Sequence, residues 1–113
     1  MADHDRGELL RGTLDMLVLR SLQLGPMHGW GIADRLEQGS EQLFQLGQGS
    51  LYPALYRLER QGLIGSTWRI TENNRRARYY ALTAAGRAHL AREREAWNRF
   101  ARAVELVLRM TNE

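Results

Sequence analysis

Apolar residues recur every three or four positions in the first part of the chain, a spacing typical of amphipathic helices. Residues 8–24 carry them on two sides, which predicts a helix buried on two sides. In so small a domain, its second side could meet another subunit. Gly25-Pro26 ends this helix. The pattern resumes over residues 28–38 and predicts a second helix, which ends at Gly39.

A third helix is predicted over residues 51–62, with leucines on one side and tyrosines and arginines on the other. Ser50 is a suitable N-cap, because its hydroxyl can accept a hydrogen bond from a first-turn N–H group. Pro53 then falls at about the third helical position, where its missing N–H has no intrahelical partner. The proline would therefore help to start this helix.

The helical spacing gives way to alternation after residue 63. The even-numbered residues from Ile64 to Ile70 share one face of a predicted strand, by the two-residue period. Residues 78–82 are rich in aromatic side chains and return as a second strand, and residues 71–77 form the polar turn. Residues 44–46 could add a short third strand to this hairpin.

The last helix is predicted over residues 84–110, which contain no proline, with Thr83 as its N-cap. Its apolar positions repeat every seven residues, and no second layer is left in the chain to cover them. A helix from another subunit is the simplest cover, and the alternative is that this helix folds back on its own domain. The predicted dimer interface comprises Leu90, Trp97, Phe100, Ala101, Val104, Val107 and Leu108.

This order of elements predicts an α+β fold that is mostly α. Residues 1–82 would form a winged helix-turn-helix domain, and residues 83–113 would form a long C-terminal dimerisation helix. A helix followed at once by a hairpin suits a DNA-binding domain, since the helix can enter the major groove while the hairpin lies on the neighbouring backbone.

Charge is unevenly distributed and supports this interpretation. Residues 1–48 carry four arginines against seven acidic residues, whereas residues 49–78 carry six arginines against two glutamates. The positive charge therefore lies on the third helix and the hairpin, as nucleic-acid binding requires. All sixteen basic residues are arginine, which can contact phosphate or guanine through two hydrogen bonds.

Nine residues are the candidate contacts to double-stranded DNA. Three on the third helix would face the major groove, two would lie near phosphates at the helix start, and four would hold the backbone or the minor groove from the hairpin. In that order they are Tyr52, Tyr56 and Arg57, then Gln48 and Ser50, then Asn74, Arg75, Arg76 and Arg78. The alternative for the hairpin tip is a solvated, mobile turn.

Other classes of function find little support. His4, His28 and His89 are too scattered for metal-ligand spacing, and the chain has neither a phosphate-binding glycine loop nor a serine elbow. We therefore predict no enzyme activity, no metal and no cofactor. There is no cysteine, and the apolar run at residues 14–24 is too short and too polar to span a membrane. The protein is expected to be cytoplasmic.

Three segments resemble the PadR family of bacterial transcription regulators, in its short form with one C-terminal helix. They are residues 24–32, 49–59 and 75–83, and the resemblance extends over about residues 9–100. Trp30 replaces the usual tyrosine and Arg78 an often-seen lysine. The resemblance implies a homodimer that binds an inverted-repeat operator, usually as a repressor, and that often releases it when a small ligand binds.

Trp97 has two interpretations, as a buried dimer anchor or as part of an effector site. Some members of the family hold flat aromatic compounds between tryptophans of paired C-terminal helices, and residues 94–100 are similar to theirs. A small planar aromatic ligand is therefore a candidate partner. Two other hypotheses remain for the whole chain: a winged domain that binds only protein, and a ligand carrier that binds no DNA.

Overall fold

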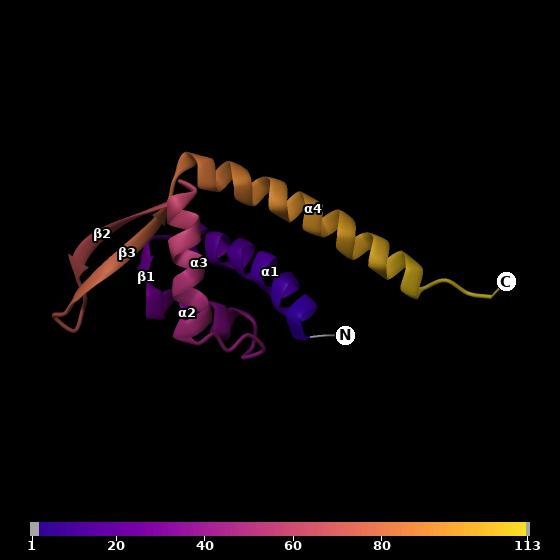
Figure 1. The fold of residues 1–113 in the computed structure, drawn as a ribbon, viewed down its shortest axis with the longest axis horizontal. Helices are drawn as coiled ribbons and strands as arrows, with labels where there is room; N and C mark the ends of the chain where they lie inside the picture. Colours follow the sequence, from indigo (N-terminus) through magenta and orange to yellow (C-terminus); the bar gives the residue numbers. More distant parts are fainter. Residues whose placement is uncertain (1–2, 113) are drawn as a thin grey trace.

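The computed structural model describes residues 3–112, without the side chains of residues 3–11 and of Gln48. Four helices and three strands follow one another along the chain, and the last helix extends away from the other elements (Figure 1). The elements are α1 (Asp3–Gln23), β1 (Met27–His28), α2 (Gly29–Gly39), α3 (Gln48–Arg60), β2 (Ile64–Ile70), β3 (Arg76–Leu82) and α4 (Ala84–Leu108). The predicted mostly helical winged helix-turn-helix fold is confirmed. None of these helices combines the length and the apolar character that a membrane span requires.

The sheet is antiparallel, with β3 between β1 and β2. The predicted strand at residues 44–46 is wrong: these residues lie in an irregular connection, and the third strand is β1. Met27 and His28 pair with Tyr80 and Tyr79, because the turn after α1 carries the chain past the free edge of β3. Residues 44–46 are diverted by the preceding turn, where two residues adopt left-handed backbone angles.

Helix α3 begins earlier than predicted. Gly47 is its N-cap, so Ser50 lies inside the first turn and caps nothing, contrary to the prediction. Pro53 becomes the sixth helical residue, and the helix loses one backbone hydrogen bond there. The predicted C-terminal boundary also shifts, because Gly62 follows the helix in a left-handed turn with φ of 76°.

One hydrophobic core joins α1, α2, α3, the sheet and the first turns of α4. Its buried members are Val18, Leu19, Leu22, Ile32, Leu36, Leu51, Leu55, Leu58, Leu63, Ile64, Tyr80 and Leu90. Leu90 is 1% exposed within a single chain, so its assignment to the dimer interface is wrong. The heptad spacing continues into the turns of α4 that cover their own domain, and there it marks the core.

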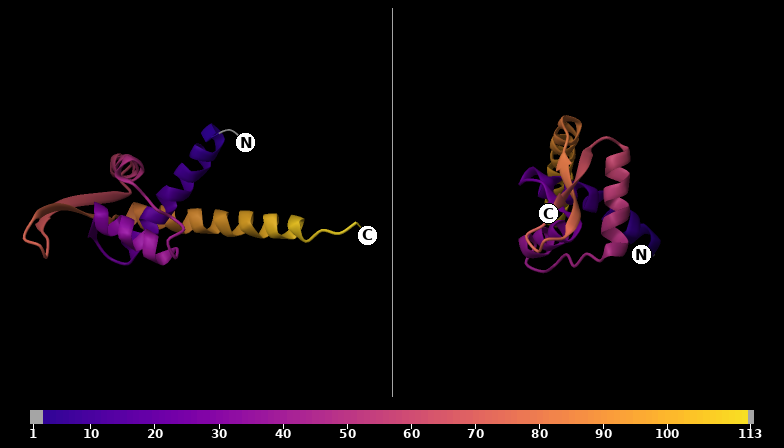
Figure 2. Two further views of the ribbon diagram at one scale, coloured as in Figure 1. Left: turned by 90° about the horizontal axis from the view of Figure 1, so that it is seen from below. Right: turned by 90° about the vertical axis from the view of Figure 1, so that its left-hand side faces the viewer.

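Helix α4 starts as predicted, because the Thr83 hydroxyl accepts a hydrogen bond from the Gly86 N–H group at 3.0 Å. Gly86 lies against the Leu63 carbonyl, where a Cβ atom would clash with the backbone. Beyond Leu90 the helix projects along the longest dimension of the molecule, which extends 64 × 27 × 24 Å, and α1 diverges from it (Figure 2). The projecting part exposes apolar side chains, at Trp97, Phe100, Val104, Leu106, Val107, Leu108 and Met110.

Candidate nucleic-acid interface

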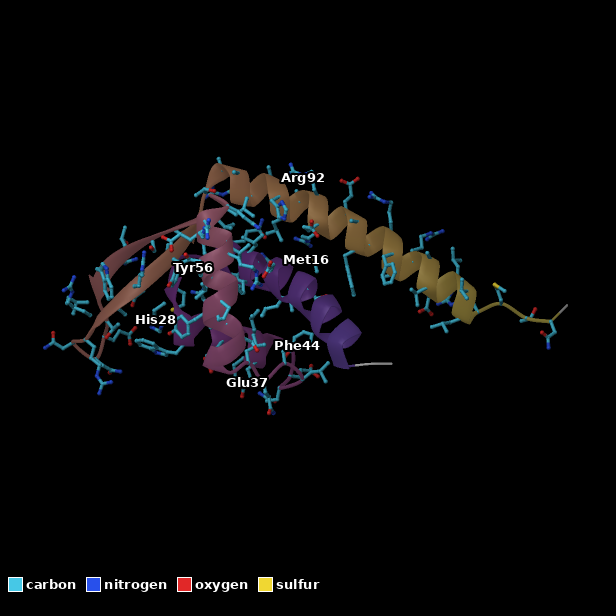
Figure 3. All side chains as sticks on the ribbon, in the orientation of Figure 1. Met16, His28, Glu37, Phe44, Tyr56 and Arg92 are labelled. Carbon is cyan, nitrogen blue, oxygen red and sulfur yellow. The ribbon has the colours of Figure 1, made fainter. Side chains whose placement is uncertain are left out.

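The outer face of α3 presents tyrosine side chains to solvent. Tyr56, labelled in Figure 3, is 63% exposed, and Tyr52 is 38% exposed. The Arg60 guanidinium lies over the Tyr56 ring, 5.7 Å from its centroid. Ser50 is exposed near the start of the same helix, whereas the Gln48 side chain lies outside the described residues. Both predicted tyrosines are therefore accessible, and the hydroxyl end of Tyr52 lies against Gly29 at the start of α2.

Arg57 leaves α3 in a different direction from these tyrosines. Its Nη2 atom donates a hydrogen bond to Asp15 Oδ1 of α1 at 2.8 Å, and the two side chains are 32% and 24% exposed. The residue predicted to face the groove is thus held against α1 by an ion pair. The acidic partner lies 42 positions earlier in the chain, and no local pattern of the sequence indicates it.

The hairpin of β2, β3 and the turn between them is the wing. At its tip, the Thr71 N–H donates to the Arg75 carbonyl at 2.7 Å, and the Thr71 hydroxyl accepts from the Arg75 N–H at 3.2 Å. Asn74 adopts a left-handed φ of 59°, which asparagine tolerates better than most residues. These contacts close the turn and leave Asn74, Arg75 and Arg76 exposed, as a phosphate-binding tip requires.

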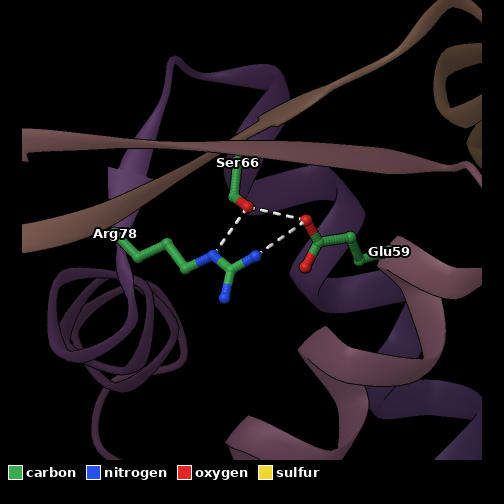
Figure 4. Close-up of polar contacts among 3 residues, drawn as sticks. All are labelled: Glu59, Ser66 and Arg78. Carbon is green, nitrogen blue, oxygen red and sulfur yellow. Dashed lines mark hydrogen bonds and ion pairs between the residues drawn. The ribbon is translucent and has the colours of Figure 1, made fainter.

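Arg78 is part of a network that joins the wing to α3 (Figure 4). Its Nε atom donates to the Ser66 hydroxyl at 2.7 Å, and that hydroxyl donates to Glu59 Oε2 at 2.6 Å. A weaker contact of 3.4 Å joins Arg78 Nη2 to the same carboxylate oxygen. Arg78 therefore neutralises Glu59 beside the tyrosine surface and fixes the near end of the wing.

A stack of aromatic rings and a guanidinium connects the opposite face of the wing to α2. His28 stacks on Trp30 with centroids 3.7 Å apart, and Tyr79 meets His28 edge-on at 5.1 Å. Arg69 lies 4.5 Å above the Tyr79 ring. His28 also caps α2, since its Nδ1 atom accepts from the Gly31 N–H at 3.0 Å.

Two titratable groups near the sheet have shifted pKa values. Burial lowers the pKa of His28 below 6.5, and Arg35 acts in the same direction. The neutral ring is therefore favoured, as its role as a hydrogen-bond acceptor demands. Burial raises the pKa of the Tyr80 hydroxyl, so this core residue stays neutral.

The wing also carries exposed apolar residues that the candidate contacts did not include. Trp68 is 58% exposed and Ile70 is 61% exposed, and the Arg76 guanidinium lies 5.1 Å from the centroid of the Trp68 ring. The two-residue period identified the face that they share with Ile64. The sequence did not show how far the hairpin extends beyond the core, so it could not tell that Ile64 is buried while Trp68 and Ile70 are exposed.

An open hollow of about 340 Å³ lies between α1 and α4. Its walls are formed by Gly12, Thr13, Met16, Glu93, Ala96, Trp97 and Phe100. The Trp97 and Phe100 rings lie 6.0 Å apart, and Trp97 is 44% exposed. Within the described residues, no group of three histidine or acidic side chains is arranged to hold a metal ion.

Known proteins share both this sequence and this fold. Residues 18–92 match the PadR-like family of transcriptional regulators. A transcriptional regulator of Mycobacterium tuberculosis is 34% identical over 97 residues, which are 86% of this chain and 87% of the relative. The solved structure of a PadR family regulator from Eggerthella lenta is 30% identical, with a TM-score of 0.79 over 96% of this chain and 93% of its own. A PadR family regulator from Clostridium difficile is 27% identical, with a TM-score of 0.74 over 83% of this chain and 96% of its own. The chain therefore belongs to the PadR-like family of transcriptional regulators.

Proposed function

We propose that this regulator binds double-stranded DNA as a homodimer and represses transcription from an inverted-repeat operator. The observation that carries the proposal is the accessible tyrosine face of α3 next to a wing whose closed tip carries exposed arginines. Tyrosine hydroxyls can contact phosphates and base edges, and arginines can hold the backbone or the minor groove. Two such surfaces would read half-sites about 34 Å apart, which is one turn of the duplex.

Salt dependence and arginine variants test DNA binding. The protein should bind a duplex selected from a random pool, and its affinity should fall steeply as salt rises because bound arginines release counterions. Changing Arg75 and Arg76 together to alanine should weaken binding and flatten the salt dependence. Arg99→Ala is the matched control, because this exposed arginine of α4 pairs only with Glu95 among the described residues. Duplex binding without salt dependence would contradict the proposed phosphate contacts, and failure to bind any duplex would favour a domain that binds protein alone.

The exposed stripe of α4 supports the homodimer. Without Leu90, the proposed interface comprises Trp97, Phe100, Ala101, Val104, Val107 and Leu108, all of them exposed in the single chain. Burying these side chains against the same stripe of a second chain would remove a large apolar surface from water. Val104→Glu should therefore give a monomer in sedimentation velocity, and Arg102→Glu, on another side of the helix, should stay dimeric. A dimeric Val104→Glu protein would overturn this interface.

The hollow beside Trp97 supports an effector site for a small planar aromatic molecule. Such a molecule could stack on the indole, and it could release DNA only by binding one dimer geometry better than another. Anilinonaphthalene sulfonate is a suitable fluorescent probe. The Trp97→Ala variant should bind the probe more weakly than the wild type does. In the wild type, bound probe should lower the affinity for DNA by a coupling free energy of about 1–3 kcal/mol. If bound probe leaves DNA affinity unchanged, Trp97 serves as a dimer anchor. Tight probe binding by a protein that binds no duplex would instead indicate a ligand carrier.

A further inference from the structure

The wing has an apolar edge, formed by Trp68 and Ile70. Both residues lie on the face of β2 that also carries Ser66, because side chains two residues apart share a face. Ser66 reaches Glu59 of α3 through its hydroxyl, so this face of the hairpin is the one next to the recognition helix (Figure 4). Trp68 and Ile70 therefore lie on the same side of the wing as α3, but farther out toward the tip than the residues that pack in the core.

Arginine surrounds this edge and restricts what can cover it. Residues 64–82 carry four arginines and one glutamate. Opposite Trp68 and Ile70 in the register stand Arg78 and Arg76, and Arg76 also lies over the Trp68 ring. A second copy of the wing would bring like charges together, which opposes self-association. A partner that covers this edge should therefore carry negative charge at its borders, to meet the arginines, and less polar surface between them, to meet Trp68 and Ile70. The minor groove of a duplex fits this description, since phosphates flank its sugars and base edges.

We propose that Trp68 and Ile70 form a wedge that enters the minor groove beside each half-site and opens a base step. The inference rests on the proposed DNA binding and adds a source of specificity to it. Proteins that insert apolar side chains between bases unstack the step and bend the duplex, and the free energy of doing so depends on how deformable the step is. Flexible steps such as TA are deformed more easily than stiff A-tracts. The wing thus selects DNA by its deformability.

The experiment compares two versions of one duplex that the wild-type protein selects from a random pool. They differ only beneath the wing, where one has a TA step and the other an AA step. Bending is measured by energy transfer between dyes at the duplex ends, and affinity by fluorescence anisotropy. The wild type should bend the TA duplex and prefer it by about tenfold over the AA duplex.

Trp68→Ala and Ile70→Ala, made singly and together, should lose the bend and the preference while retaining affinity for the AA duplex. Thr67→Ala is the control, because this exposed residue lies on the opposite face of β2. Since Trp68→Ala could disturb the hairpin, Ile70→Ala alone must also reduce the bend. The wedge is overturned if the wild type binds without bending, if the variants keep the preference, or if they change the oligomeric state. Failure of the wild type to bind any duplex would overturn DNA binding itself.

Discussion

The ion pair between Arg57 and Asp15 determines how many guanidinium groups α3 can offer to DNA. While Arg57 is bound to Asp15 at 2.8 Å, it is held against α1. Asp15→Asn keeps the size of the side chain and removes its charge, so Arg57 should become free to reach a phosphate. We expect this variant to bind DNA more tightly at low salt than the wild type does.

The size of the effect follows from the exposure of the pair and from counterion release. Because both side chains are about a quarter to a third exposed, water screens their attraction, and its loss should cost only about 0.2–1 kcal/mol of folding stability. The variant should therefore stay folded. Each new phosphate contact should steepen the slope of log affinity against log salt by about 0.9. Between 50 and 200 mM salt, one such contact corresponds to an additional affinity loss of about 3.5-fold.

Fluorescence anisotropy titrations over that salt range measure both quantities. Arg57→Ala is the matched variant, and combining it with Asp15→Asn should abolish the gain, because no guanidinium remains to be released. If Asp15→Asn instead weakens binding with an unchanged slope, the pair serves to place α3. The same slope in Asp15→Asn and in the double variant would also refute the reasoning.

Three other substitutions test the fold. Gly86→Ala should destabilise the protein by about 1–3 kcal/mol in urea unfolding, because its Cβ would meet the Leu63 carbonyl, whereas Gly49→Ala has open space and should not be destabilising. Ser21→Ala should stabilise it by roughly 1 kcal/mol, since this buried hydroxyl has no hydrogen-bond partner among the described residues. The lowered pKa of His28 contributes stability that is complete above pH 6.5 and is lost as the pH falls through the folded-state pKa. His28→Asn keeps an N-cap and should remove this part of the dependence of stability on pH.

The sequence was informative where a segment is long enough to show its period. The leucines of α3 and the alternation of β2 predicted both elements, and the hydroxyl of Thr83 predicted the start of α4. Strand β1 has only two residues, which are too few to show any period. It pairs with β3 because the chain, after leaving α1, passes along the edge of the sheet. Residues 44–46 were predicted as a strand wrongly because three residues are also too few to show a period.

The partners of individual side chains could not be predicted from the sequence, for a different reason. Arg57 and Arg78 have the charge and position of DNA contacts, and a pattern cannot tell that one meets Asp15 and the other meets Glu59. Leu90 shows the same limit, because a core position and a dimer position on one helix have the same spacing. Only the place where α4 leaves its own domain separates the two.

The contacts on the two faces of the wing bear on how regulation could work. Arg78, Ser66 and Glu59 restrain one face against α3, and the stack through Tyr79 and His28 restrains the other against α2. Within one chain, these contacts therefore fix the spacing between α3 and the wing without any ligand. In the proposed homodimer, the adjustable quantity is the placement of one such unit relative to the other. A signal at the hollow between α1 and α4 would change that placement, so it should alter the preferred half-site spacing more than the bases read within a half-site.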